Sequence, residues 1–301
     1  MFSSVTVKAP AKLNLSLDIM DSGEDDYHLM RTVMQTVDLE DEIIIKKNNL
    51  GQLNLSCGNE NVPQGAENLA YKVALAFFEE TRIEDIGVDI VINKNIPMAA
   101  GLAGGSADAA GVLVGLNELY ETNLKDDKLC EIVLRLGADI PFCIKGGIKL
   151  ADGIGEIFTP LPRLPECYFV IVKPQESMST KIAFELFDKF GSFKKPDVDS
   201  MVAGIVAQNL DVIAEHMCNE FEEPVSARVP EIAEIKHALL ECEAIGASMT
   251  GSGTAVFGLF NNKNKAKKCV KILEERYEEV FLTVPIDVGA TVVKKDEWSV
   301  S

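Results

Sequence analysis

The segment 97-PMAAGLAGGSADAA-110 decides the fold, because it joins a strand-like stretch to a helix-like one through a run of small residues. Alternating apolar residues predict a strand over residues 86–93, and helical periodicity begins at Ser106. Small residues let a ligand approach the backbone, and the free N–H groups that open a helix attract phosphate. The segment is therefore either a phosphate-binding loop or a tight packing turn.

Two common phosphate loops are excluded at this segment. No Lys precedes Ser106, as a Walker A motif requires, and the G-x-G-x-x-G pattern is absent. Ser106 is a candidate helix cap, and its hydroxyl could also reach a metal-bound phosphate. The residues expected around the phosphates are Pro97, Met98, Ala99, Ala100, Gly101, Leu102, Ala103, Gly104, Gly105, Ser106 and Ala107.

Outward from this loop, the alternation of apolar and polar residues predicts a strand over residues 12–19. Leu13 and its apolar partners face the core, which leaves Lys12 and Asn14 together on the other face. An ammonium group there could stabilise charge on oxygens during group transfer. The alternative is a solvated strand face.

A carboxylate follows the helix predicted over residues 126–136, which ends at Gly137. Asp139 lies between this glycine and an Ile-Pro step that predicts extended backbone. A carboxylate held there could take a proton from a substrate hydroxyl, as phosphoryl transfer requires. The alternative is an Asp that only stabilises a turn.

Two further segments could face a ligand. Tyr27 and His28 end a turn that begins at Asp25, where a ring could stack on a base or pack beneath the loop. Residues 248–254 form a glycine-containing turn, which is either a hairpin turn or a second backbone wall near phosphates.

Composition limits the class of protein. The 301 residues carry a net charge of −18, from 29 Lys and Arg against 47 Asp and Glu, so we expect no nucleic-acid partner. Seven dispersed Cys and three His indicate reduced thiols rather than a zinc site. We also expect no signal peptide and no membrane helix, and therefore a cytoplasmic location. No oligomeric state is predicted.

Strands and helices alternate without a regular βαβ period, which predicts an α+β fold. The proline-rich stretch 160–165 marks the expected domain boundary. We therefore expect two domains, residues 1–160 and 161–301.

Three segments in this order resemble the GHMP kinase superfamily: Pro10-Ala11-Lys12-Leu13-Asn14, the loop 97–110 and the glycine turn 249–253. The Asp26-Tyr27-His28 turn and residues 136–142 make the chain similar to its kinases for cytidyl-diphospho-methylerythritol. The resemblance implies an N-terminal ribosomal-protein-S5-like domain and a C-terminal ferredoxin-like domain. It also implies ATP-dependent phosphorylation of the 2-hydroxyl of that substrate, in the non-mevalonate isoprenoid precursor pathway.

The resemblance implies a role for each matching residue. Asp139 would be the general base, and Lys12 would orient it and neutralise developing charge. Residues 97–107 would wrap the phosphates of ATP with Mg²⁺, which Ser106 would approach. The substrate residues would be Asn14 at the polyol hydroxyls, Tyr27 and Phe184 on the two faces of cytosine, His28 at its edge, and Thr180 near the diphosphate.

Three positions depart from the family pattern: Asp26 and Ala103 replace Gly, and Ala107 replaces Ser. A methyl group at Ala103 could restrict the approach of a ligand to the backbone. Two alternatives stay open, namely a GHMP kinase for another alcohol such as mevalonate or homoserine, and a non-catalytic nucleotide-binding protein of the same fold.

Overall fold

The computed structural model describes residues 2–22, 28–60, 62–192 and 194–297. The strands are β1 (Phe2–Ser22), β2 (His28–Lys47), β3 (Leu53–Cys57), β4 (Val88–Asn93), β5 (Ile148–Asp152), β6 (Ile157–Pro160), β7 (Tyr168–Lys173), β8 (Cys218–Asn219), β9 (Gly246–Met249), β10 (Val256–Phe260), β11 (Glu279–Thr283) and β12 (Thr291–Glu297).

The helices are the short 3-10 helix η1 (Gly65–Glu67) and α1 (Leu69–Thr81), α2 (Gly104–Leu119), α3 (Asp126–Val133), α4 (Ile140–Lys145), α5 (Thr180–Phe190), α6 (Val198–Val206), α7 (Leu210–Glu215), α8 (Glu222–Ser226), α9 (Glu231–Glu241) and α10 (Lys263–Leu273). Sheets and helices mix in both halves of the chain, which confirms the predicted α+β class.

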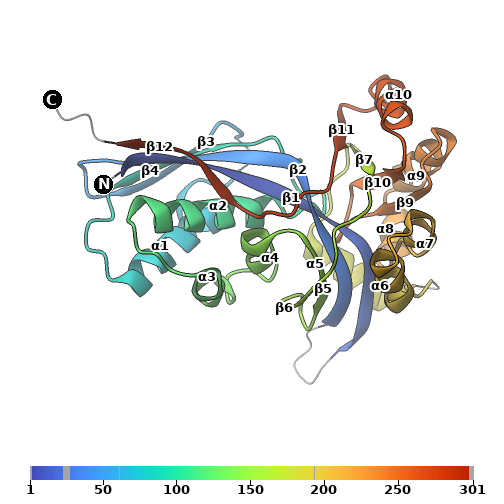
Figure 1. Ribbon diagram of the computed structural model, residues 1–301, viewed down its shortest axis with the longest axis horizontal. Coiled ribbons are helices and arrows are strands. Elements are labelled where there is room, and N and C mark those ends of the chain that lie inside the picture. The colour runs from blue at the N-terminus through green and yellow to red at the C-terminus, as the bar shows by residue number, and fades with distance from the viewer. Residues whose placement is uncertain (1, 23–27, 61, 193, 298–301) are drawn as a thin grey trace.

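The first sheet has eight strands, five of them in the order β12-β1-β2-β4-β3. Helices α1 to α4 lie along one face of it, and β1 and β2 continue beyond it as a long ribbon toward the second half of the molecule (Figure 1). Strand β1 is much longer than the predicted strand of residues 12–19, since it runs from Phe2 to Ser22. The ribbon carries Lys12 and Asn14 to the place where the two halves meet.

The second sheet has four antiparallel strands in the order β11-β7-β10-β9. The elements of this layer follow the order β7, α9, β9, β10, α10, β11, with α5 to α8 and β8 inserted between β7 and α9, and both α9 and α10 contact the sheet. This arrangement is the ferredoxin-like fold that the resemblance implied. The sheet begins after the proline-rich stretch, whereas β12 pairs with β1 in the first sheet, so the division at residue 160 stays a prediction.

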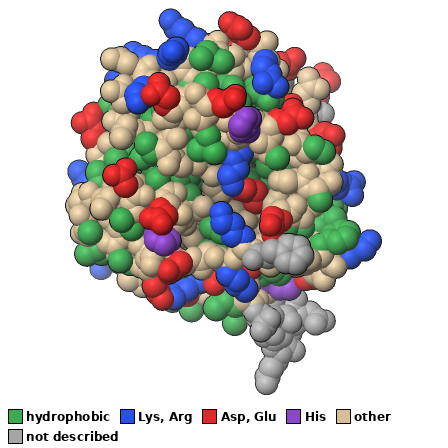
Figure 2. Space-filling view, turned by 90° about the vertical axis from the view of Figure 1, so that its right-hand side faces the viewer, with side chains coloured by type: hydrophobic (Ala, Val, Ile, Leu, Met, Phe, Trp, Pro, Cys, Tyr) green, Lys and Arg blue, Asp and Glu red, His purple; other side chains and the backbone are tan. Residues whose placement is uncertain are grey.

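Two apolar clusters hold these layers together. One joins the first sheet to α1 and α2 through residues such as Ile43, Phe77 and Leu113, and the other fills the second sheet beneath α9 and α10. On the face formed by the right-hand elements of Figure 1, acidic and basic side chains are intermixed rather than gathered by sign (Figure 2). Within the described part of the chain, no helix is long and apolar enough to cross a membrane.

Candidate active site

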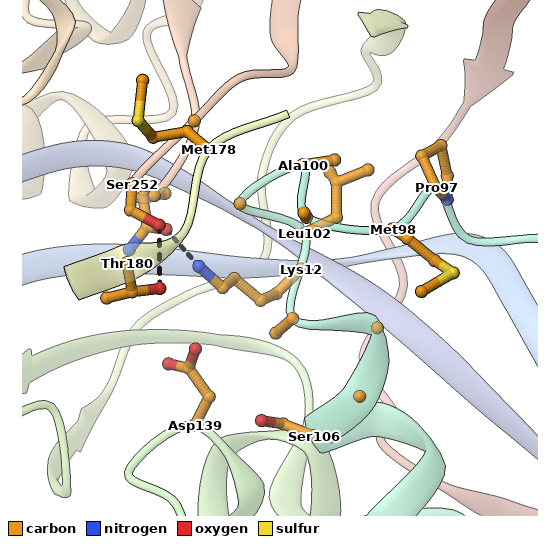
Figure 3. A pocket seen from close by; sticks show the side chains of 18 of the residues that line it. Lys12, Pro97, Met98, Ala100, Leu102, Ser106, Asp139, Met178, Thr180 and Ser252 are labelled. Atoms are coloured by element: carbon orange, nitrogen blue, oxygen red, sulfur yellow. Dashed lines mark hydrogen bonds between the residues drawn. The ribbon is translucent and has the colours of Figure 1, made fainter. Parts of the chain in front are cut away.

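A cavity of about 500 Å³ lies where β1, the loop before α2, α4 and α5 meet (Figure 3). Its lining includes Lys12, Asn14, Asp139, Thr180 and Phe184, together with every residue from 97 to 106. Residues separated by up to 241 positions in sequence, Lys12 and Gly253, thus reach one space.

Two predicted site residues are placed otherwise, and a third lies outside the described residues. Ala107 is fully buried in α2 and does not line the cavity. His28 also lies outside the lining, although its ring packs on Phe184, which belongs to it. Tyr27 lies outside the described residues, so its contact with a base stays a prediction.

The helix that follows the glycine loop begins two residues earlier than the sequence predicts. Its N-cap is Ala103, in the left-handed region at φ 59°, and Ser106 is the third helical residue rather than the cap. Ala107 N–H donates to Ala103 O at 2.8 Å, which leaves the N–H groups of Gly104, Gly105 and Ser106 outside the helical ladder. All three residues line the cavity, so the positive end of α2 faces it and suits an anion.

The carbonyl groups of the loop are turned away from this space, because protein donors take three of them in succession. Ala255 N–H donates to Ala100 O at 3.1 Å, the Thr250 hydroxyl to Gly101 O at 3.4 Å, and Lys12 N–H to Leu102 O at 3.2 Å. A loop whose carbonyl oxygens are occupied in this way presents little negative charge to a phosphate.

The turn between β9 and β10 is the second wall of the cavity as well as a hairpin turn. Gly101 and Gly251 both have positive φ and meet backbone to backbone. A Cβ on Gly101 would lie 2.0 Å from Thr250 O, and one on Gly251 would lie 2.7 Å from Gly101 O. Only glycine fits at either position.

Lys12 is 4% exposed, so the strand face that it shares with Asn14 is not a solvated face. The β1–β2 register shifts before Lys12 and again after Asn14, and such irregularities re-aim side chains beside functional sites. The Lys12 ammonium hydrogen-bonds Asn14 Oδ1, and a Cβ on Gly251 would lie 3.1 Å from its Nζ. The ammonium is therefore fixed between the strand and the glycine turn.

The carboxamide of Asn14 is already engaged by the protein. Its Nδ2 donates to Thr32 Oγ1 at 2.8 Å, while its Oδ1 accepts from Lys12. This orientation makes Asn14 a partner of Lys12 at the edge of the cavity, and its predicted contact with polyol hydroxyls stays a prediction.

Asp139 is the N-cap of α4 and has helical backbone angles, φ −78° and ψ −17°. The expectation of extended backbone at the Ile140-Pro141 step was wrong, because a proline in the first turn of a helix lacks only an N–H that would be unpaired there anyway. Helix α4 packs on α2, which brings the carboxylate of Asp139 into the cavity beside Ser106 (Figure 3). Within the described residues, no ion pair shorter than 4.0 Å joins Asp139 to Lys12.

Aromatic rings pack together at the far end of the cavity. The His28 imidazole stacks on Phe184 with ring centroids 5.0 Å apart and planes 6° from parallel, and Phe221 meets Phe184 edge-on at 4.8 Å. His28 Nε2 lies 2.9 Å from an Asp188 carboxylate oxygen, while its buried Nδ1 has no partner among the described residues. Thr180, on the first turn of the same helix, contacts the hydroxyl of Ser252 at 3.1 Å.

Sequence reasoning missed a buried charged cluster beneath the glycine loop. Lys94 pairs with Asp41 and, at 2.8 Å, with Asp108, and both Lys94 and Asp108 line the cavity. Burial raises the pKa of Asp108 to about 7, because the Lys94 ammonium offsets only part of the desolvation. Burial opposes the charge on Lys94, but the two carboxylates raise its pKa. The one signal in the sequence was Asp108, two residues after Ser106.

Two sequence models of a known family, and known proteins with this architecture, match the chain. The sequence model described as the N-terminal domain of GHMP kinases matches residues 68–147, and the C-terminal one matches residues 201–279. A protein of Caldicellulosiruptor bescii named 4-diphosphocytidyl-2-C-methyl-D-erythritol kinase is 42% identical over 277 residues, which is 92% of this chain and 96% of that protein. The chain belongs to this kinase family.

Other relatives agree with this assignment. The kinase of the same name from Clostridium novyi is 39% identical over 92% of this chain and 98% of its own. The crystal structure of a 4-(cytidine 5'-diphospho)-2C-methyl-D-erythritol kinase superposes with a TM-score of 0.77 at 29% identity, covering 93% of this chain and 98% of that one. A homoserine kinase from Cytophaga hutchinsonii shares the fold, with a TM-score of 0.79 at 22% identity over 97% of this chain and 98% of its own.

Proposed function

We propose that the chain is a cytoplasmic enzyme that transfers the γ-phosphoryl group of ATP to the 2-hydroxyl of 4-diphosphocytidyl-2-C-methyl-D-erythritol. One observation carries the proposal: Lys12, Asp139 and the N-terminus of α2 line the same cavity in a chain of this family. A base, a cation and a set of N–H groups are the parts that phosphoryl transfer needs.

Each part has one task in the reaction. The N–H groups at the start of α2 bind the phosphates of ATP, and Lys12 stabilises the negative charge that builds on the transferring oxygens. Asp139 accepts the proton of the 2-hydroxyl while the oxygen of that hydroxyl bonds to the γ-phosphorus. The bond from that phosphorus to the β–γ bridging oxygen breaks, ADP leaves, and the proton remains on Asp139.

A Mg²⁺ ion fits this site as a companion of ATP. No cluster of three or more His, Cys, Asp or Glu side chains suitable for a metal occurs in the part of the chain that the structure describes. The hydroxyl of Ser106 and the carboxylate of Asp139 are oxygen donors at the same cavity, and Mg²⁺ commonly combines a few such donors with substrate phosphates. The ion would neutralise charge on the phosphate oxygens, and Ser106 is the residue that we place beside it.

The aromatic end of the cavity would hold the cytidine. Phe184 offers a ring that lines the cavity, and we assign the opposite face of cytosine to Tyr27 and its edge to His28. Thr180 would then lie near the diphosphate, and Asn14 near the polyol. Because His28 rests on Phe184 here, the base has to share that ring with the imidazole or displace it.

The purified protein offered ATP with the cytidyl compound, mevalonate or homoserine tests the substrate. We expect ADP formation with the cytidyl compound alone, and turnover of mevalonate or homoserine in its place would contradict the proposal.

The variant Asp139→Asn tests the base. We expect kcat to fall by about 10²- to 10⁴-fold, the range for losing a positioned base, with ATP binding within a few-fold of the original. ATP affinity from calorimetry and initial rates measure the two effects separately. Unchanged turnover would remove Asp139 from the mechanism.

A further inference from the structure

Asn219 is a buried polar residue, 4% exposed, at the end of the two-residue strand β8. This strand pairs in parallel with β1, so that Asn219 lies opposite Leu17. Its Nδ2 donates to two backbone carbonyl groups, Met249 O and Gly251 O, both at 2.8 Å, and its Oδ1 accepts from Phe221 N–H at 3.0 Å. Both amide protons and the carbonyl oxygen are used, so only a carboxamide satisfies this environment.

One of the two carbonyl groups that Asn219 holds, Gly251 O, belongs to the turn that faces Lys12, and the other, Met249 O, ends β9 just before it. Gly251 begins this turn and packs closely against both neighbours, since a Cβ added to it would lie 2.7 Å from Gly101 O and 3.1 Å from Lys12 Nζ. Thr250, just before it, accepts Asn14 N–H at 2.9 Å. A shift of the turn would therefore change the place of the Lys12 ammonium.

The segment around Asn219 also holds the strand that leads into this turn. Glu222 Oε2 accepts Met249 N–H at 2.8 Å and the Ser248 hydroxyl at 3.1 Å. Both backbone groups of Met249 are thus fixed by side chains from residues 219–222. The turn is clamped from one side by this segment and from the other by β1.

We propose that Asn219 is a positioning residue for phosphoryl transfer, which holds the turn of residues 251–253 in place against Lys12. The kinetic part of this inference rests on the proposed function. Because Asn219 does not line the cavity, its loss should leave binding of both substrates largely intact and misplace the groups that act on the γ-phosphoryl group.

Two variants test the proposal. Asn219→Asp keeps the size and the acceptor for Phe221 N–H but turns an oxygen toward two carbonyl groups, and Asn219→Ser is too short to bridge them. The matched control is Asn117→Asp, since the Asn117 Nδ2 donates to Leu124 O at 3.0 Å and its Oδ1 accepts Leu124 N–H at 2.9 Å, at the far end of α2.

We expect both Asn219 variants to lose about 10- to 100-fold in kcat, the scale of a misplacement near 1 Å, while KM for ATP and for the cytidyl compound stays within about threefold. The control should lose thermal stability without a change in kcat per folded molecule. The proposal would be overturned if KM for ATP changed by as large a factor as kcat. It would also be overturned if folded variants kept kcat within about twofold of the original.

Hydrogen–deuterium exchange keeps the inference separate from the enzyme assay. In the unliganded protein, the amides of Met249, Thr250 and Gly253, which donate to Glu222, Ala255 and Thr250, should be as protected as those of β10. In Asn219→Ser they should exchange at least about fivefold faster, with α1 unchanged. Fast exchange of these amides in the original protein, or none gained in the variant, would overturn it, even if no variant retains activity. An original protein without turnover would contradict the proposed function alone.

Discussion

At the cavity, residues 97–106 and the turn 251–253 meet backbone against backbone, whereas α5 and β2 meet through side chains. The first wall is fixed by carbonyl groups that accept from Ala255, Thr250 and Lys12, and by two glycines in contact. We call it the backbone wall. We call Phe184, with His28 packed on it and Asp188 in contact with His28, the ring wall, and of these three only Phe184 lines the cavity.

The ring wall depends on rotatable groups near solvent. His28 stacks on Phe184 and meets Phe187 edge-on at 6.0 Å, and its Nε2 lies 2.9 Å from the carboxylate of Asp188, whose side chain is 54% exposed. An exposed pair of this kind contributes little to stability, so the ring wall can rearrange at small cost.

This difference assigns the two walls to different tasks. Phosphate is common to every ATP-dependent kinase, and a backbone surface binds it whatever the side chains are. The acceptor differs between enzymes, and homoserine and mevalonate kinases share this fold at 22% and 15% identity. We expect changes in the backbone wall to impair chemistry with any acceptor, and changes in the ring wall to affect one substrate.

Gly101→Ala should break the backbone wall and has the largest expected effect. The new Cβ would lie 2.0 Å from Thr250 O, so the loop and the turn must separate. We expect kcat/KM for both substrates to fall by about 10²- to 10³-fold, because a misplacement near 1 Å already costs about 10²-fold. Steady-state kinetics with each substrate varied in turn measures the loss.

Gly51→Ala is the control for that experiment. Gly51 has a similar φ of +62° but nothing within 4 Å of an added Cβ, and it lies in the remote turn between β2 and β3. It should lose stability through backbone strain and keep its kinetic constants. If the two glycine variants behaved alike, close contact would not be what fixes the backbone wall.

Phe184→Ala should weaken only the ring wall. Stacking of a base on an aromatic ring contributes about 1–3 kcal/mol, so we expect KM for the cytidyl compound to rise by about 5- to 100-fold. KM for ATP should change by less than about threefold. The matched control is Phe190→Ala, which removes a 57% exposed ring from the same helix without lining the cavity. Equal effects on both substrates would show that the walls are not independent.

Local patterns in the sequence predicted the features that depend on neighbouring residues alone. Alternation along β1 placed Lys12 on the opposite strand face from Leu13, and small residues before α2 placed the anion site at a helix start. The helix begins at Gly104 because Ala103 takes a left-handed conformation, which no propensity rule anticipates for Ala. The presence of Lys12 and Asp139 at one cavity depends on the whole fold.

Long-range partners carry no such pattern. Asp41 and Lys94 meet 53 positions apart, and Asn219 lies in a strand of two residues, too short for any periodicity. A polar side chain can be buried only where hydrogen-bond partners satisfy it. Here those partners come from segments that are distant in the sequence. The buried cluster and the clamp on the glycine turn are therefore visible only in three dimensions.

Ala103→Gly has the smallest expected effect, a slight gain in the stability of the backbone wall. Ala103 has φ 59°, a region that costs an L-residue about 1–2 kcal/mol and glycine almost nothing. Part of this gain is lost to the greater freedom of glycine in the unfolded chain, about 0.5–1 kcal/mol. We expect a net stabilisation near 0.5 kcal/mol and a Tm about 1–2 °C higher, measured by calorimetry.

The control for that variant is Ala100→Gly, which makes the same chemical change at a buried position without positive φ. It should lower Tm, because it adds chain freedom and removes a packed methyl group. Shifts in Tm of opposite sign in the two variants would show that the left-handed backbone conformation at Ala103 costs stability in the backbone wall. A lower KM for ATP in Ala103→Gly would show in addition that the methyl group of Ala103 restricts the approach of phosphate, and equal shifts in Tm would contradict the strain at Ala103.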